Sequence, residues 1–222
     1  MINFALFSAL SAFYFTMFIT PGPNNAMLTT SGMKFGFIKT LPHLIGIPLG
    51  HIFQIALVCF GFANLFLIYP QIQVYMKILC FLYLLYLSWK MIGSFSLDKK
   101  DSGRPLKFYE ASLFQFINPK AWSIAIAVAS GFFPTEENIF IGISFVTITA
   151  AIICFPSISL WALFGSGLRA FINNEKIKKM TEYFLALLLV LTGLFILIKQ
   201  SLIFIPPSTI SLVKCISQKK AH

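Results

Sequence analysis

Residues 20–25 read Thr-Pro-Gly-Pro-Asn-Asn, and they follow the apolar run 4–19 directly. Because proline lacks a backbone donor and crowds the preceding turn, this stretch should end an α-helix. The apolar pattern nevertheless resumes at once in residues 26–28, and Gly22 and Pro23 suit a helix cap and a first helical residue. The run before the break also falls short of the roughly 20 residues that cross a bilayer. We therefore predict a single membrane helix that is broken here.

A second break, Asn-Pro-Lys-Ala-Trp at residues 118–122, lies inside the apolar run 111–133. The apolar residues after it are too few to cross the bilayer alone, so the break is expected at membrane depth. Asn118 suits an N-cap and Pro119 suits the first helical position. The stretch therefore predicts the start of a new helical segment inside the membrane.

The composition indicates a membrane protein rather than a soluble domain. Of 222 residues, 58% are hydrophobic and 11% are charged, whereas soluble domains carry about 25% charged residues. Long continuous apolar runs are typical of helices and not of outer-membrane barrels, whose strands alternate. We predict an all-α polytopic membrane protein with six transmembrane helices, at residues 4–19, 41–63, 72–92, 111–133, 139–163 and 181–199.

The charges between the runs predict an orientation. Basic residues gather in the first, third and fifth connections, for example Lys34, Arg104 and Lys176, whereas the fourth connection carries only Glu136 and Glu137. Cationic loops stay on the cytoplasmic side, so both termini are predicted to lie outside.

A weak internal repeat relates the two halves of the chain. An offset of about 96 residues superimposes Pro23 on Pro119 and Gly46 on Gly142. A unit of three spans is odd, so its second copy must enter the membrane from the opposite side, as in the inverted repeats of many transporters. We predict a 3+3 inverted repeat, divided into a first repeat, a basic cytoplasmic connection, a second repeat and an interfacial or disordered tail, at residues 1–96, 97–110, 111–200 and 201–222.

Two proline motifs and a set of glycines resemble the LysE/RhtB-type amino-acid exporters over roughly residues 4–200. The residues that carry the resemblance are Pro21-Gly22-Pro23-Asn24, the glycines at 32, 36, 46 and 50, and Asn118-Pro119-Lys120-Ala121. The resemblance implies a multi-pass transporter of the bacterial inner membrane that exports amino acids or close derivatives, driven by the proton gradient. One departure is His51, which stands where the family pattern often has an acidic residue.

The two breaks are the predicted substrate site. Each aims a helix N-terminus into the membrane interior, where backbone amides and the helix dipole favour a carboxylate such as that of an amino acid. Two proline kinks that only shape helix packing are the alternative. The predicted substrate-binding residues are Pro21, Gly22, Pro23, Asn24, Asn25, Asn118, Pro119 and Lys120.

Ionisable residues within the spans need a reason to be there, because burying charge in lipid is costly. Lys120 has three interpretations: binding of a substrate carboxylate or gating, contact with the carbonyls of a broken helix, or snorkelling. His51 lies near the midplane and is the candidate proton carrier, while a neutral histidine bonded to a neighbouring helix is the alternative. His43 ranks lower, and Lys77 and Glu110 are expected to reach an interface.

The glycines at 32, 36, 46 and 50 form small-residue faces that permit close helix packing. Gly32, Gly36, Gly46 and Gly50 are therefore predicted to pack helices, and such faces would also permit a homodimer. The basic loops suit anionic lipid heads, and no nucleic-acid motif accompanies them.

The sequence offers little for other functions. Its four cysteines show no metal-ligand spacing, so no metal or other cofactor is predicted, and no catalytic motif suggests an enzyme. A membrane thiol-disulfide relay is one alternative, since such enzymes can be built from a repeat of three spans. A scaffold subunit without transport activity is the other. The small-molecule partner expected from the breaks is an amino acid.

Overall fold

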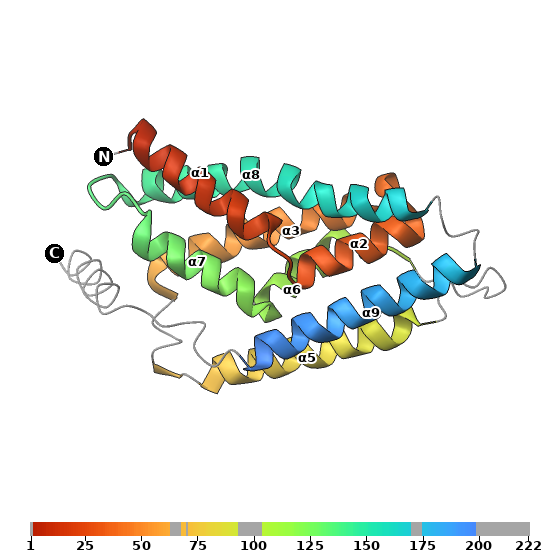
Figure 1. Ribbon diagram of the computed structural model, residues 1–222. Coiled ribbons are helices and arrows are strands. Elements are labelled where there is room, and N and C mark those ends of the chain that lie inside the picture. Colours follow the sequence, from red (N-terminus) through yellow and green to blue (C-terminus); the bar gives the residue numbers. More distant parts are fainter. Residues whose placement is uncertain (1, 63–67, 70, 93–103, 170–174, 199–222) are drawn as a thin grey trace.

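The computed structural model describes residues 2–62, 68–69, 71–92, 104–169 and 175–198, and this part of the chain is helical without strands (Figure 1). The helices are α1 (Phe4–Ile19), α2 (Pro23–Phe35), α3 (Phe37–Leu57), the π-helical turn η1 (Val58–Phe62), α5 (Gln71–Met91), α6 (Phe108–Ile117), α7 (Pro119–Gly131), α8 (Ile139–Leu168) and α9 (Glu175–Ile198). The predicted tail, residues 201–222, lies outside the described residues.

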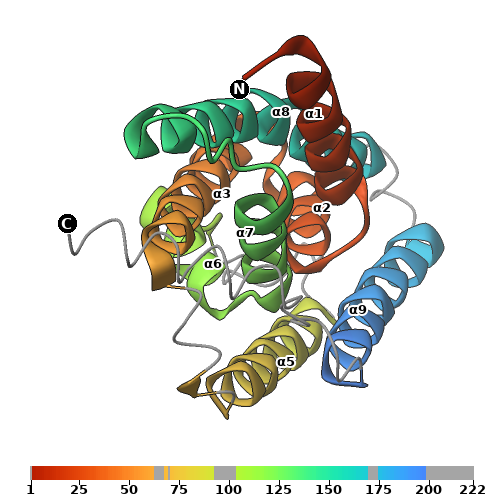
Figure 2. The same cartoon turned by 90° about the vertical axis from the view of Figure 1, so that its left-hand side faces the viewer.

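The helices lie side by side along one long axis, as Figures 1 and 2 show. Helices α1 and α8 begin, and α7 ends, at the left end of Figure 1, and α9 runs toward that end from the right. The opposite end holds the end of α2 and the beginning of α9. The chain therefore passes repeatedly between two ends of one bundle, as a membrane protein must.

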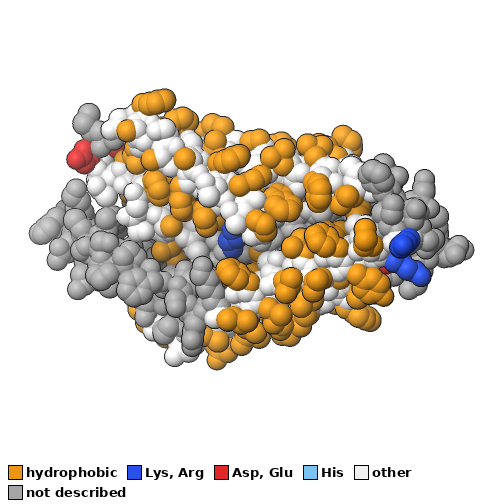
Figure 3. Space-filling model, in the orientation of Figure 1, with side chains coloured by type: hydrophobic (Ala, Val, Ile, Leu, Met, Phe, Trp, Pro, Cys, Tyr) orange, Lys and Arg blue, Asp and Glu red, His pale blue; other side chains and the backbone are white. Residues whose placement is uncertain are grey.

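Within the described part of the chain, three helical segments are long and apolar enough to cross a membrane: Phe37–Gly61, Ile139–Leu168 and Lys179–Ile198. The pair α1 and α2 passes the same test together, bent by 58° at its break, and Val74–Trp89 forms a shorter apolar helix. Large hydrophobic side chains are exposed on most of the helices, and on the face drawn in Figure 3 they surround a cluster of Lys and Arg at the right-hand end and one further cationic side chain in the middle. Exposed apolar surface on this scale needs lipid around it, and the chain is a polytopic membrane protein.

Both predicted breaks are present. Helix α1 ends at Ile19 and α2 begins at Pro23 with Gly22 as its cap. Helix α6 ends at Ile117, and α7 begins at Pro119 with Asn118 as its cap. The expected caps and first helical residues are thus confirmed, because a proline needs no amide partner at the first helical position.

Glycines permit two close helix contacts. A Cβ on Gly32 would lie 2.2 Å from the carbonyl oxygen of Ala162, which brings α2 against α8. A Cβ on Gly46 would lie 2.2 Å from the carbonyl oxygen of Phe108, and one on Gly50 would lie 2.5 Å from that of Ser112. These two glycines bring α3 against α6, so the backbones of the two halves touch directly.

Gly36 has a different structural role from its neighbours. It joins α2 to α3 with φ of 82°, a conformation that favours glycine, and its amide donates to the Gly32 carbonyl. A Cβ there would also come within 2.8 Å of the Arg169 guanidinium. The residue turns the chain between two helices, which small-residue spacing alone did not indicate.

The position of Lys77 differs from the position expected from the sequence. Its side chain is 8% exposed, so it is buried within the bundle instead of reaching an interface. Glu182, on the neighbouring helix α9, is 3% exposed. Burial of a charged side chain requires compensation from the protein.

Candidate functional site

The break between α1 and α2 is closed by an asparagine. Asn25, which is 3% exposed, donates from Nδ2 to the carbonyl oxygens of Phe18 and Thr20, both at 2.8 Å. These carbonyls lie at the end of α1, where the helix leaves acceptors without intrahelical partners. Asn25 therefore stabilises the broken backbone itself.

The break between α6 and α7 has a different cap. Asn118 is 2% exposed, and its Oδ1 accepts a hydrogen bond of 3.1 Å from the Lys120 amide. The indole Nε1 of Trp122 donates to the Phe116 carbonyl at 2.9 Å, which satisfies an acceptor at the end of α6. Both sides of the break are thus held by side chains of α7 and its cap.

Lys120 joins the two breaks. Its Nζ lies 2.7 Å from the carbonyl oxygen of Thr20 and 3.4 Å from that of Pro21. The carboxyl end of a helix carries partial negative charge, so the end of α1 is a favourable position for a cation. Of the three interpretations of this lysine, contact with broken-helix carbonyls is the one present in this conformation.

A pair of amides forms a second link between the breaks. Asn24 Nδ2 donates to Gln115 Oε1 at 2.9 Å, and Gln115 Nε2 donates to Asn24 Oδ1 at 3.2 Å. Gln115 is fully buried and also donates to the Ala111 carbonyl at 2.9 Å. The start of α2 is therefore bonded to the end of α6 at the centre of the bundle.

His51 extends this polar cluster along α3. Gln54 Nε2 donates to the Gln115 carbonyl at 3.1 Å, so the Gln54 Oε1 faces His51 Nδ1, 3.2 Å away. That contact makes Nδ1 the donor, and a neutral ring then keeps its lone pair on Nε2. Nε2 is buried and has no hydrogen-bond partner among the described residues.

A cavity lies where these groups meet. Its walls include Gly22, Pro23, Asn24, Asn25, His51, Gln115, Asn118 and Lys120, together with the apolar side chains Met17, Phe18, Ile47, Ala121, Ile124 and Ile158. The cavity volume is about 30 Å³, close to the space that one water molecule occupies in the liquid. Sites for small molecules measure roughly 300–1,000 Å³, so this conformation has no room for an amino acid, which requires the breaks to separate.

The walls of this cavity hold a single charged side chain, the Lys120 ammonium, among the described residues. A cation beside the start of α2 suits a carboxylate, and the amide oxygens of Asn24 and Gln115 suit an ammonium group. Such a set of groups can hold both ends of a zwitterion.

The structure brings most of the predicted substrate residues to this cavity, adds Gln115 to its walls, and adds Gln54 as a partner of His51 and Gln115 outside the walls. Pro21 and Pro119 shape the breaks without lining the cavity. Gln54 and Gln115 are polar residues inside apolar runs, and Gln54 follows His51 by three residues, on the same helix face. This spacing was the available signal for Gln54.

The cysteines of the described part lie elsewhere. Cys59, Cys80 and Cys154 are buried free thiols, and none of them lines the cavity. A thiol relay requires a reachable pair of thiols, so the arrangement of these three residues gives that alternative no support.

Comparison with known proteins identifies relatives over most of the chain. A family model described as "LysE type translocator" matches residues 15–200. The chain is 31% identical over 160 residues to the cysteine/O-acetylserine efflux proteins of Salmonella paratyphi A and Salmonella typhi, covering 70% of this chain and 82% of each relative. It is 28% identical to the protein of the same name from Escherichia coli strain K12, with the same coverage. No solved structure matches the chain.

Proposed function

The chain belongs to the LysE type translocator family, and we propose that it exports small amino acids or close derivatives through the cavity between its two breaks. The observation that carries this proposal is the cluster of Lys120, Asn24 and Gln115, which joins two interrupted helices inside an apolar bundle. Interrupted helices in corresponding positions of two halves are typical of substrate sites in secondary transporters.

The packing supports a 3+3 inverted repeat with six crossings. Helices α1 and α2 pack against α8, whereas α6 and α7 pack against α3. Each broken span thus lies on the long helix of the other half, and α5 packs against α9. A pseudo-two-fold axis through the bundle would exchange the two broken spans with each other, and α3 with α8. The repeat of about 96 residues in the sequence predicts this symmetry.

The orientation follows from charge. Arg104, Lys107 and Arg169 lie at the end of the bundle where α6 begins and α8 ends, while Glu137 lies just before α8 begins. The positive-inside rule makes the basic end cytoplasmic. The beginning of α1 and the end of α9 then lie on the outer side of the inner membrane.

Substrate binding begins with an exchange of partners at Lys120. A substrate carboxylate replaces the Thr20 carbonyl at the Lys120 ammonium, which releases the end of α1 from α7. The substrate ammonium then takes the amide oxygens of Asn24 and Gln115 in place of their mutual bonds. Because both exchanges separate the breaks, a bound zwitterion favours opening, and rocking of the two halves exposes it to either side in turn.

The named function of the relatives narrows the substrate class. Cysteine and O-acetylserine are small zwitterions with short polar side chains, and a site whose charged and amide groups face both ends of a zwitterion suits them. His51 supplies the coupling, because it lines the same cavity and its Nε2, which has no hydrogen-bond partner among the described residues, accepts a proton when the substrate leaves.

Transport into proteoliposomes tests the proposal. Purified protein should accumulate radiolabelled O-acetyl-L-serine or L-cysteine when the lumen is acidic, and a protonophore should abolish this accumulation. His51→Gln should retain passive exchange of substrate and lose the response to the proton gradient. Liposomes that accumulate neither compound above the empty control under any gradient would contradict the proposal.

A further inference from the structure

A second, larger cavity lies toward the basic end of the bundle. Its volume is about 390 Å³, which falls within the roughly 300–1,000 Å³ of sites that bind small molecules. Its walls come from α2, α3, α5, α6 and α9 and from the segment Arg104–Leu106 that precedes α6. The cavity between the breaks shares only α2, α3 and α6 with it, at different residues.

His43 is the polar group that this cavity leaves unsatisfied. Its side chain is 1% exposed and lines the cavity, and neither ring nitrogen has a hydrogen-bond partner among the described residues. Buried polar atoms are almost always paired. A neutral imidazole offers one donor and one acceptor, so the ring is suited to a polar group inside the cavity.

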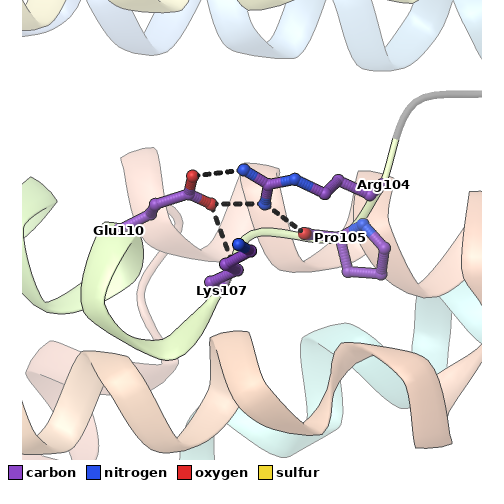
Figure 4. A network of polar contacts seen from close by, with 4 residues as sticks. All are labelled: Arg104, Pro105, Lys107 and Glu110. Atoms are coloured by element: carbon purple, nitrogen blue, oxygen red, sulfur yellow. Dashed lines mark hydrogen bonds and ion pairs between the residues drawn. The ribbon is translucent and has the colours of Figure 1, made fainter.

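An ion pair forms the charged wall of the same cavity (Figure 4). Arg104 binds both carboxylate oxygens of Glu110, with Nη1 at 2.7 Å and Nη2 at 2.5 Å, and the Lys107 amide donates to Glu110 at 2.8 Å. Arg104 also donates to the Pro105 carbonyl at 3.2 Å. The pair fixes the segment before α6 against the first turn of that helix, and it presents one cation and one anion together.

Apolar and aromatic side chains form much of the rest of the wall. Met27, Tyr83, Leu87 and Leu189 line it, and the Tyr83 ring packs on Phe114 with centroids 5.2 Å apart. A molecule that fits this cavity therefore has charged groups of both signs at one end, a polar atom within reach of His43 and a small apolar body.

The two cavities lie in series along the same helices. On α6, Glu110 lines the larger cavity and Gln115 lines the smaller one, a separation of about 7.5 Å at 1.5 Å per residue. On α2, Lys34 and Ser31 line the larger cavity, whereas Asn24 and Asn25 line the smaller one. The larger cavity therefore lies nearer the basic end than the smaller one, on three of the same helices.

We propose that the cavity around His43 and the Arg104–Glu110 pair is a second binding site for the transported amino acid, filled before the site between the breaks. The proposal rests on the proposed export function. The substrate carboxylate takes the Arg104 guanidinium from Glu110, the freed Glu110 carboxylate takes the substrate ammonium, and His43 bonds a polar atom of the side chain. Breaking the ion pair releases the segment before α6.

Equilibrium binding of radiolabelled O-acetyl-L-serine to the purified full-length protein tests this site. Wild type should bind two molecules per chain. His43→Leu and Lys120→Met should each bind one, because each removes a different site. Arg104→Gln, which changes a side chain that is more than half exposed, should weaken one binding event about 10-fold, as expected when a charge-assisted hydrogen bond is lost. Lys107→Gln is its matched control, since Lys107 does not line the cavity, and it should bind as wild type.

The outcomes separate the two proposals. The second site would be overturned if the wild type bound one molecule per chain, if Lys120→Met lost it, and if His43→Leu and Arg104→Gln kept it at unchanged affinity. This result would leave the export site in place. Absence of binding to the wild type, under conditions in which it remains monodisperse, would overturn both. A misfolded His43→Leu variant could also lose one bound molecule. Its loss therefore supports the second site only if Arg104→Gln also weakens one binding event.

Discussion

The Nζ of Lys120 lies 2.7 Å from the carbonyl oxygen of Thr20, a residue 100 positions earlier in the chain. This contact connects the beginning of α7 to the end of α1, so the two interruptions are bonded to each other. It places a cation where the dipole of α1 is negative. Any conformation that opens the cavity between the breaks must replace this bond with another.

Replacement of Lys120 should impair transport more than folding. Lys120→Met keeps the length of the side chain and removes its charge, so we expect export of O-acetyl-L-serine to fall at least about 10-fold, the loss of one charge-assisted contact. Lys120→Arg should retain part of the activity, because a guanidinium keeps the charge in another shape. Lys39→Met, at an exposed position of α3, is the control. Export by Lys120→Met at the wild-type rate would contradict the role of this ammonium.

The amide pair predicts a non-additive pair of substitutions. Asn24→Leu leaves the buried Gln115 amide without its partner, and Gln115→Leu leaves the half-buried Asn24 amide without its partner, so each should cost about 1–3 kcal/mol of stability. The double variant removes both amides and should recover part of that loss, because no polar group is then left unpaired. Thermal unfolding of the wild type, the two single variants and the double variant in detergent measures these losses of stability. The double variant should still fail to export, and strictly additive losses of stability would show that the pair is not coupled.

Gly165 should tolerate no side chain. A Cβ there would lie 2.0 Å from the Thr29 carbonyl oxygen, so Gly165→Ala must push α8 away from α2. Overpacking of this kind costs about 1–3 kcal/mol, and the melting temperature should fall. Gly167→Ala is the matched control two residues later, because nothing lies within 4 Å of its added Cβ. Equal melting temperatures for the two variants would contradict the close approach of these helices.

The Arg104–Glu110 pair predicts a defined pH dependence. Glu110 precedes the apolar run 111–133 at the basic end, and hydrogen bonds from Arg104, with a further one from the Lys107 amide, lower its pKa from 4.5 to about 2. A lowered pKa contributes stability above the unfolded-state value, and that contribution disappears as the pH falls from about 4.5 toward 2. The gap in melting temperature between wild type and Glu110→Gln should be constant from about pH 8 to 5 and narrow below about pH 4.5. A gap in melting temperature that narrows between pH 8 and pH 5 would contradict the lowered pKa of Glu110.

Much of the fold follows from local sequence. The apolar runs gave the helices because a backbone in lipid must satisfy its own hydrogen bonds, and the two proline motifs gave the breaks because proline lacks a donor. The first run, residues 4–19, coincides with α1. Helix α6 begins at Phe108, three residues before its apolar run, because Glu110 caps the first turn.

The contacts between the breaks could not be predicted in the same way. Sequence placed Asn24 and Lys120 in two interruptions, but their partners Gln115 and Thr20 depend on how the halves pack. Gln115 is a polar residue in an apolar run, and nothing in its local pattern distinguishes a lining residue from one that bonds a neighbouring helix. The buried position of Lys77 likewise depends on the packing of α5, which no span boundary reveals.

Accessibility of the cavity between the breaks from both sides of the membrane tests the central claim most directly. Ala121 lines this cavity and Ala125, one turn later, is buried away from it, so each is replaced by cysteine in a chain whose four native cysteines are serine. A membrane-impermeant maleimide should label Ala121→Cys in right-side-out and in inside-out vesicles, more slowly when O-acetyl-L-serine is present, and should leave Ala125→Cys unlabelled. Labelling of Ala121→Cys from neither side, or from both sides without protection by the amino acid, would contradict a substrate site between the two breaks.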